Sequence, residues 1–204
     1  VPVSRFSTIQ LNGMNTETPD FDIVSTYNGG EMASGSVAFT IAANFTETDV
    51  TDIFVPDVDA ISSLDSIVVI NSQDISIIEE WQPEDRISAS ALYSRDDWTV
   101  NFSLNHFGEY TTQDSGTQTY SAEILTDLFV KYRVNERISV NFTGNNIFDV
   151  TPDEATNRLS RDGLFESSLG AADLGRDSVF RYSRRSAPFG FNGAYYSVGV
   201  SYDF

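Results

Sequence analysis

Six arginines between residues 149 and 193 are the side chains best suited to holding a charged ligand. They are Arg158, Arg161, Arg176, Arg181, Arg184 and Arg185. A guanidinium group matches the geometry of carboxylates and phosphates, so these residues are candidate contacts for an anionic substrate. The same stretch also contains Asp153, Asp162, Asp173 and Asp177. We favour internal ion pairs with these acids over ligand contact.

Residues 49–85 form an acidic stretch without lysine or arginine. Its acids are Asp49, Asp52, Asp57, Asp59, Asp65, Asp74, Glu79, Glu80, Glu84 and Asp85. Such a run attracts cations, including calcium. No calcium-loop spacing is present, so we favour a solvated loop.

Other chemistry is sparse. The chain has no cysteine and a single histidine, His106, which lacks a second ligand at metal-site spacing. We expect His106 to fill an interface position near the end of a strand. There is no nucleophile elbow, P-loop or dinucleotide fingerprint. The sequence therefore predicts a protein that is not an enzyme, without a cofactor or a metal site.

Composition narrows the class further. Twelve Lys and Arg against 30 Asp and Glu give a net charge of −18, which argues against nucleic acid and against a polybasic grip on anionic lipid. No apolar run approaches the length of a membrane helix, which excludes a helical membrane protein. The first residues lack the pattern of a signal peptide, so we expect a mature or truncated start.

The elements that must position these residues are strands. In "YYSVGVSYDF", which ends the chain, large apolar residues alternate with small or polar ones, as on the two sides of a strand. The same period of two recurs in earlier segments. It predicts seven strands, over residues 21–28, 35–48, 86–94, 97–110, 122–134, 137–148 and 195–204.

The connections between these strands alternate in length. Short turns fall at residues 29–35, 94–97 and 134–137, and long polar stretches at 49–85, 111–121 and 149–193. Short connections on one edge and long ones on the other are typical of outer-membrane barrels.

The polar sides of the strands are rich in Ser, Thr and Asn, which suits a wet lumen. Strands of about a dozen residues are close to the roughly 9 to 11 that a tilted membrane strand needs. Aromatic residues flank the strands in two groups, as in the girdles of a barrel. They are Tyr93, Trp98, Tyr132, Tyr202 and Phe204 beside the short turns, and Tyr110 and Phe148 near the long loops.

A sheet edge cannot stay unpaired in lipid, so seven strands imply part of a larger barrel. The predicted fold is all-β, an antiparallel transmembrane barrel segment with its apolar side on lipid. If instead Val100, Phe102, Val140, Phe142, Val198 and Val200 were enclosed in one compact centre, this interpretation would be wrong.

Several motifs, taken in order, resemble the C-terminal third of TonB-dependent outer-membrane receptors. A "QP" at 82–83 precedes a strand pair, "FGEY" at 107–110 ends the second strand, "NNIFD" at 145–149 closes the penultimate strand, and an aromatic residue ends the chain. The resemblance covers residues 15–204. Each motif alone is weak, and the combination is specific.

The resemblance implies a barrel of about 22 strands, closed by an N-terminal plug, that imports scarce ligands such as ferric siderophores, haem or oligosaccharides. Its implied partners are the TonB system, the outer-membrane assembly machinery and outer-membrane lipid of a Gram-negative cell. Residues 1–204 would be the C-terminal part of such a barrel, without the plug, the TonB-contacting box or the N-terminal strands. The alternating final strand resembles the assembly signal, which we assign to Tyr196, Val198, Val200, Tyr202 and Phe204.

Two alternatives stay open. A passive porin would share the barrel and lack the plug. A secreted all-β binding or adhesion module would instead bury the aromatic residues in a core or display them as a sugar platform. Such a module would stay monomeric without detergent.

Overall fold

The structure of the protein, a computed structural model, describes residues 12–32, 34–55, 70–113, 117–154, 182 and 188–204. In order, the elements are β1 (Met14–Glu17), β2 (Asp20–Met32), β3 (Gly35–Thr46), β4 (Asp49–Ile53), α2 (Ser72–Glu79), β5 (Asp85–Arg95), β6 (Trp98–Phe107), β7 (Tyr110–Gln113), β8 (Thr117–Tyr120), β9 (Glu123–Arg133), β10 (Ile138–Asn145) and β11 (Tyr195–Tyr202). The predicted all-β, antiparallel class is confirmed. Among these residues, no helix has the length and hydropathy needed to cross a bilayer.

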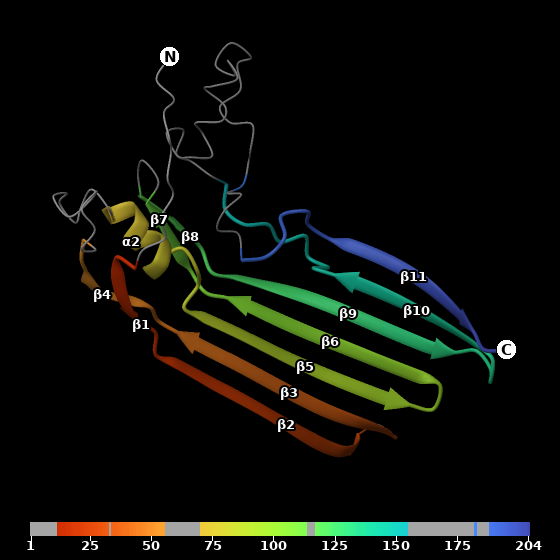
Figure 1. Ribbon diagram of the computed structural model, residues 1–204. Coiled ribbons are helices and arrows are strands. Elements are labelled where there is room, and N and C mark those ends of the chain that lie inside the picture. Colours follow the sequence, from red (N-terminus) through yellow and green to blue (C-terminus); the bar gives the residue numbers. More distant parts are fainter. Residues whose placement is uncertain (1–11, 33, 56–69, 114–116, 155–181, 183–187) are drawn as a thin grey trace, which may run out of the picture.

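Seven strands form the main sheet, in the order β11-β10-β9-β6-β5-β3-β2. Every neighbouring pair is antiparallel, and each predicted strand corresponds to one of the seven. The tight turns β2–β3, β5–β6 and β9–β10 lie at one end of the sheet, which we call the turn end (Figure 1). The longer connections lie at the other end, the loop end.

The turns are closed by their own side chains. In the β9–β10 turn, the Asn135 side-chain oxygen accepts hydrogen bonds from the backbone N–H groups of Arg137 and Ile138, both at 2.9 Å. In the β5–β6 turn, Asp96 has a positive φ of 49°, a conformation that Asp adopts more readily than most residues. Asp97 accepts a hydrogen bond from Arg133 Nε at 2.8 Å, which ties this turn to β9.

Two predicted strands end earlier than their sequence patterns suggested. β6 stops at Phe107, because Gly108 turns the chain back against Asp85, whose carbonyl accepts the Gly108 N–H at 2.9 Å. A Cβ atom at Gly108 would collide with the Asp85 carboxylate. β10 stops at Asn145, because Asn146 adopts a left-handed backbone with φ 50°.

The loop end carries regular structure that the sequence analysis treated as loop. β1 pairs with β4, and β7 pairs with β8. α2 begins with a capping box, in which Asn71 accepts the backbone N–H of Asp74 while the Asp74 carboxylate accepts the N–H of Asn71, both at 3.1 Å. β1, β4, β7, β8 and α2 gather beyond the loop ends of the long strands (Figure 1).

Most of the buried apolar residues lie at this loop end. Trp81 is buried and donates its indole N–H to the buried Ser76 hydroxyl at 3.0 Å. Tyr110 and Tyr120 are buried and stack with ring centroids 4.7 Å apart. The sequence analysis placed Tyr110 in an exposed aromatic girdle. That prediction is wrong, because Tyr110 belongs to a small buried cluster.

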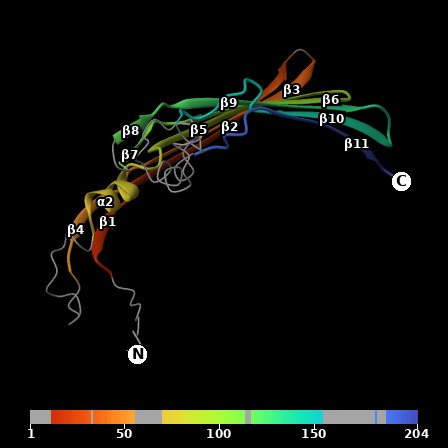
Figure 2. The same ribbon diagram turned by 90° about the horizontal axis from the view of Figure 1, so that it is seen from above.

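The main sheet itself is a single curved layer (Figure 2). Its register places most of the large apolar residues of the seven strands on one face and most of the Ser, Thr and Asn residues on the other. We call these the apolar face and the polar face. One row of the apolar face runs from Val37 through Tyr93, Val100, Val130 and Phe142 to Val198.

The apolar face is largely uncovered. Phe102 in the middle of the sheet is 40% exposed, and Val198 and Val200 on β11 are 71% and 70% exposed. The six residues whose enclosure would have contradicted the barrel interpretation are thus not gathered in a compact centre. The sheet has two open edges among the described residues, along β2 and along β11.

Candidate functional site: the loop end of the polar face

The polar face near the loop end holds the densest set of side chains able to bind a ligand. One row crosses five strands in register, from Asp22 through Asn44, Arg86 and Phe107 to Glu123. Alternation brings these residues to one face, since each is directly opposite the next. An acid, an amide, a guanidinium, a ring and a second acid therefore follow one another across the sheet.

The acids of β2 in this region are already hydrogen-bonded. Asn44 donates from its side-chain amide to Asp20 at 2.7 Å and to Asp22 at 2.9 Å. Thr46 donates to the same Asp20 carboxylate at 2.6 Å. The two carboxylates therefore point toward β3, where neutral donors satisfy them.

A second network connects β6, β9 and the end of β10. Asn105 donates to one oxygen of the Asp127 carboxylate at 3.0 Å, and the other oxygen accepts the backbone N–H of Asn146 at 2.8 Å. Asn146 is 5% exposed and closes a ring with Val150, donating to its carbonyl at 2.7 Å and accepting from its N–H at 3.0 Å. Asp127 thus holds the corner that follows β10 against the polar side of β9.

The "NNIFD" motif is this corner. Asp149, with φ 59°, accepts the backbone N–H of Ala194 at 2.8 Å, just before β11 begins. Gly193 has φ 72°, and a Cβ there would collide with the Asp149 carboxylate. The motif therefore fixes where the chain leaves β10 and where it re-enters the sheet as β11.

Arg86 and Phe107 form the centre of the site. The Arg86 guanidinium carbon lies over the Phe107 ring, 4.8 Å from its centroid. Phe189, from the segment before β11, packs against the same ring with centroids 5.2 Å apart. Phe107 is buried by these contacts, while Arg86 is exposed.

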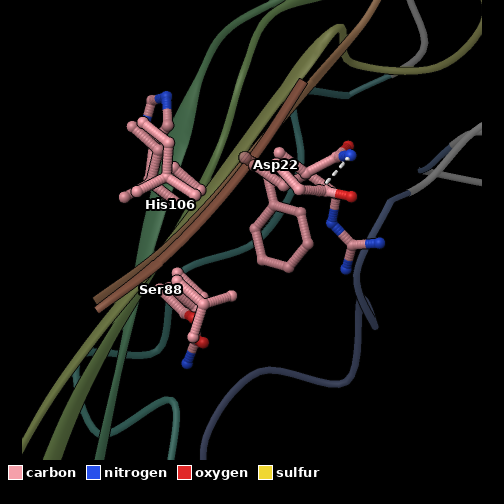
Figure 3. A pocket seen from close by; sticks show the side chains of 12 residues that line it. Asp22, Ser88 and His106 are labelled. Carbon is pink, nitrogen blue, oxygen red and sulfur yellow. Dashed lines mark hydrogen bonds between the residues drawn. The ribbon is translucent and has the colours of Figure 1, made fainter. Parts of the chain in front are cut away.

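His106 lies apart from this site. It occupies the same strand as Phe107 but the opposite face, and Figure 3 shows it across the strands from Asp22 and Ser88. Its Nε2 atom is 2.7 Å from the Asp85 carboxylate, and each side chain is about one third exposed. The pocket in Figure 3 is therefore lined by residues from both faces of the sheet. Arg86 belongs to the lining residues from the polar face.

The sequence predicted two sets of functional residues, the assembly signal in the final strand and the arginines at 149–193. The described structure contains only the first set, whose members lie close together. Tyr196, Val198, Val200 and Tyr202 share the apolar face of β11, and Phe204 packs edge-on against Tyr202 at 5.0 Å. Their role as an assembly signal remains a prediction. Arg158, Arg161, Arg176, Arg181, Arg184 and Arg185 lie outside the described residues.

Some acids of the stretch at 49–85 accept hydrogen bonds that stabilise the fold. Glu79 accepts the backbone N–H of Val50 at 2.8 Å, and Glu80 accepts from the Gln113 amide at 2.8 Å. In the part of the chain that the structure describes, no group of three or more acids or histidines is arranged to hold a metal ion.

Sequence reasoning missed Arg86, Phe107 and Asn146 as a constellation. Arg86 and Phe107 are 21 residues apart, and only the β5–β6 register brings them side by side. The "NNIFD" motif pointed to the Asn146 corner without showing its hydrogen bonds.

Comparisons of the chain with protein-family models, with curated proteins and with solved structures found no match.

Proposed function

We propose that this chain is a wall segment of an outer-membrane β-barrel, and that the protein containing it is a TonB-dependent import receptor. The single observation that carries the proposal is the two-sided sheet, with an uncovered face of large apolar residues and a hydrogen-bonded polar face. A soluble sandwich would bury the apolar face against a second layer. In a barrel that face contacts lipid, and the polar face borders the lumen.

Aromatic placement at the turn end supports the same proposal. Trp98 and Tyr132 pack with their rings tilted and their centroids 4.5 Å apart on the apolar face, and Tyr202 with Phe204 continues the group at the end of β11. Aromatic side chains with a polar tip favour the boundary between lipid and water. The long strands end at this band, as strands that span a bilayer would.

The import activity, the plug and the TonB partner come from the sequence resemblance. Its motifs lie where strands of this sheet end: "FGEY" where β6 ends and β7 begins, and "NNIFD" at the corner after β10. Both open edges fit a segment whose missing neighbours complete the barrel. In this proposal the ligand passes along the polar face.

Spin labels on single cysteines test the membrane assignment, since these 204 residues contain no native cysteine. Phe102→Cys and its neighbour Asn101→Cys form a matched pair on opposite faces. In the complete receptor in outer-membrane vesicles, we expect the label at 102 to collide often with oxygen and rarely with a water-soluble nickel complex. The label at 101 should not show this pattern. Equal behaviour at both sites would reject the lipid-facing assignment.

A second experiment separates the import receptor from a passive porin. The complete protein, purified in detergent, should retain the periplasmic domain of TonB, because a coupled receptor presents a TonB-contacting segment. A porin would not. Failure of this binding, with the labelling pattern intact, would leave the barrel and remove the coupled transport.

A further inference from the structure

We propose that Arg86, supported on Phe107, is a binding point for an oxyanion group, a carboxylate or a phosphate, of the transported ligand. The inference deepens the proposed function and rests on it, because the polar face must border the channel. It concerns a residue outside the arginine-rich stretch at 149–193.

Arg86 differs from Arg95 and Arg133 in its surroundings. Arg95 pairs with Asp96 at 3.4 Å, and Arg133 pairs with Asp97 at 2.8 Å. Among the described residues, no carboxylate pairs with Arg86, and its guanidinium lies over the Phe107 ring. In a chain of net charge −18, an arginine left without an acid is unexpected.

The neighbouring acids do not compete for Arg86. Asp20 and Asp22 accept hydrogen bonds from Asn44, which lies between them and Arg86 in the row. Asp127 is held by Asn105 and by the backbone of Asn146. Amide donors therefore contribute to satisfying these three carboxylates, and none of the three pairs with Arg86. Glu123, the other acid of the row, lies on the far side of Phe107 from Arg86.

Phe107 prepares the guanidinium for a ligand. A ring beneath a guanidinium limits its rotation and removes water from one side, and the donors at its edge remain open. Phe107 is itself fixed, since Phe189 packs against it from the segment before β11. A planar oxyanion can then accept two parallel N–H bonds, the arrangement in which arginine binds carboxylate and phosphate most strongly.

Lys131 and Arg137 are the nearest alternatives. Neither forms an ion pair among the described residues, and Lys131 shares the polar face. Neither, however, lies on an aromatic ring, and both are near the turn end. Within the part of the chain that the structure describes, only Arg86 combines a guanidinium without an acidic partner, a ring support and a place at the loop end.

Arginine modification by phenylglyoxal tests the site without knowing the ligand. The complete receptor in outer-membrane vesicles is treated with the reagent, and modification of Arg86 and Arg95 is followed by mass spectrometry. Benzoate and phenyl phosphate are the oxyanion probes. Benzyl alcohol is the uncharged control, with sodium chloride holding the ionic strength constant. Arg95 is the internal control because it already has an acidic partner.

We expect saturating benzoate or phenyl phosphate to slow the modification of Arg86 about fivefold or more, as charge-assisted bidentate binding implies. Arg95 should change little, and benzyl alcohol should protect neither. Stronger protection by benzoate indicates a carboxylate ligand, and stronger protection by phenyl phosphate indicates a phosphate ligand. Protection of Arg86 no greater than that of Arg95 overturns the proposal.

A variant pair tests the ring support. Phe107→Leu should lose most of the protection of Arg86, whereas Phe129→Leu, on the same polar face but away from Arg86, should keep it. Full protection in Phe107→Leu would show that the ring does not prepare the site. If either variant fails to assemble, the measurement on the unaltered receptor still decides the main proposal.

The two proposals fail in different ways. If the spin labels at 101 and 102 lose their lipid and lumen pattern, the barrel assignment is wrong. If that pattern holds and oxyanions do not protect Arg86, only the oxyanion site is wrong.

Discussion

At the scale of single residues, the polar face is built from pairs that satisfy each other. Asn44 with Asp22, Asn105 with Asp127, and Thr26 with Thr40 are all matched on directly neighbouring strands. Buried or crowded polar groups need such partners, because an unmatched donor or acceptor costs the free energy of its lost hydration. Arg86 has no such partner among the described residues, and the ligand proposal accounts for this.

Asn146 offers the sharpest single-residue test of stability. Asn146→Ala removes both hydrogen bonds to Val150 and places alanine at a φ of 50°, so we expect a loss of about 1 to 3 kcal/mol in the free energy of unfolding. The measurement is the temperature at which the band of the folded protein disappears on an SDS gel.

Two control variants separate the loss of the side-chain hydrogen bonds from the effect of the backbone conformation. Asn145→Ala, at the exposed neighbour, should change the midpoint little. Asn146→Gly keeps the backbone conformation and loses only the side-chain bonds, so it should fall between the alanine variant and the original protein. A midpoint for Asn146→Ala equal to that of the original protein would contradict the corner described here.

At the scale of elements, the close approach of atoms from a neighbouring strand limits which side chains a position can hold. Gly35 begins β3, and a Cβ there would lie 2.7 Å from the Ser94 backbone oxygen and 2.7 Å from the Tyr93 ring. We expect Gly35→Ala to destabilise the sheet by about 1 to 3 kcal/mol through overpacking. Gly190→Ala, where nothing lies within 4 Å of the added atom, is the control and should leave the unfolding midpoint unchanged.

A charge placed on either face of β6 should have opposite outcomes. Phe102→Arg puts a cation on the apolar face in the middle of the sheet, and its cost at a bilayer midplane is about 2 to 4 kcal/mol. Ser103→Arg puts the same charge on the polar face. The yield of folded receptor in outer-membrane fractions should drop for the first variant and hold for the second. Equal yields would argue against lipid contact.

The sequence predicted the long strands and not the elements between them. Alternation in β5, β6, β9, β10 and β11 is strong because the two faces meet different environments. The stretches at 49–85 and 111–121 lack that constraint, so β4, α2, β7 and β8 were read as loops. The "NSQD" capping box at Asn71 was a usable signal for α2. The Tyr110–Tyr120 stack could not be predicted in this way, because it depends on a hairpin that positions both rings.

The candidate site was less predictable than the fold. Side-chain facing follows from a period of two, but the partner opposite each residue depends on register between strands. Arg86 could be assigned to the polar face from sequence alone. Its place beside Phe107, and the contact of Phe107 with Phe189, required the assembled sheet.

At the scale of the whole molecule, an uncovered apolar face and two open strand edges predict poor behaviour in water. We expect the 204-residue chain, produced alone, to self-associate or precipitate without detergent, because unpaired edges and apolar patches recruit other chains. Sedimentation velocity with and without detergent is the measurement. A soluble monomer in plain buffer would favour the secreted binding module over the barrel segment.

From β3 to β11 the sheet pairs residue for residue, and the only irregularity among the seven strands lies between Asn28 and Glu31 on β2. Deleting one codon within β6 would therefore exchange the residues of the apolar face with those of the polar face beyond the deletion. Related genes should accordingly differ in length within strands by even numbers of codons, and should place odd length changes in the long connections.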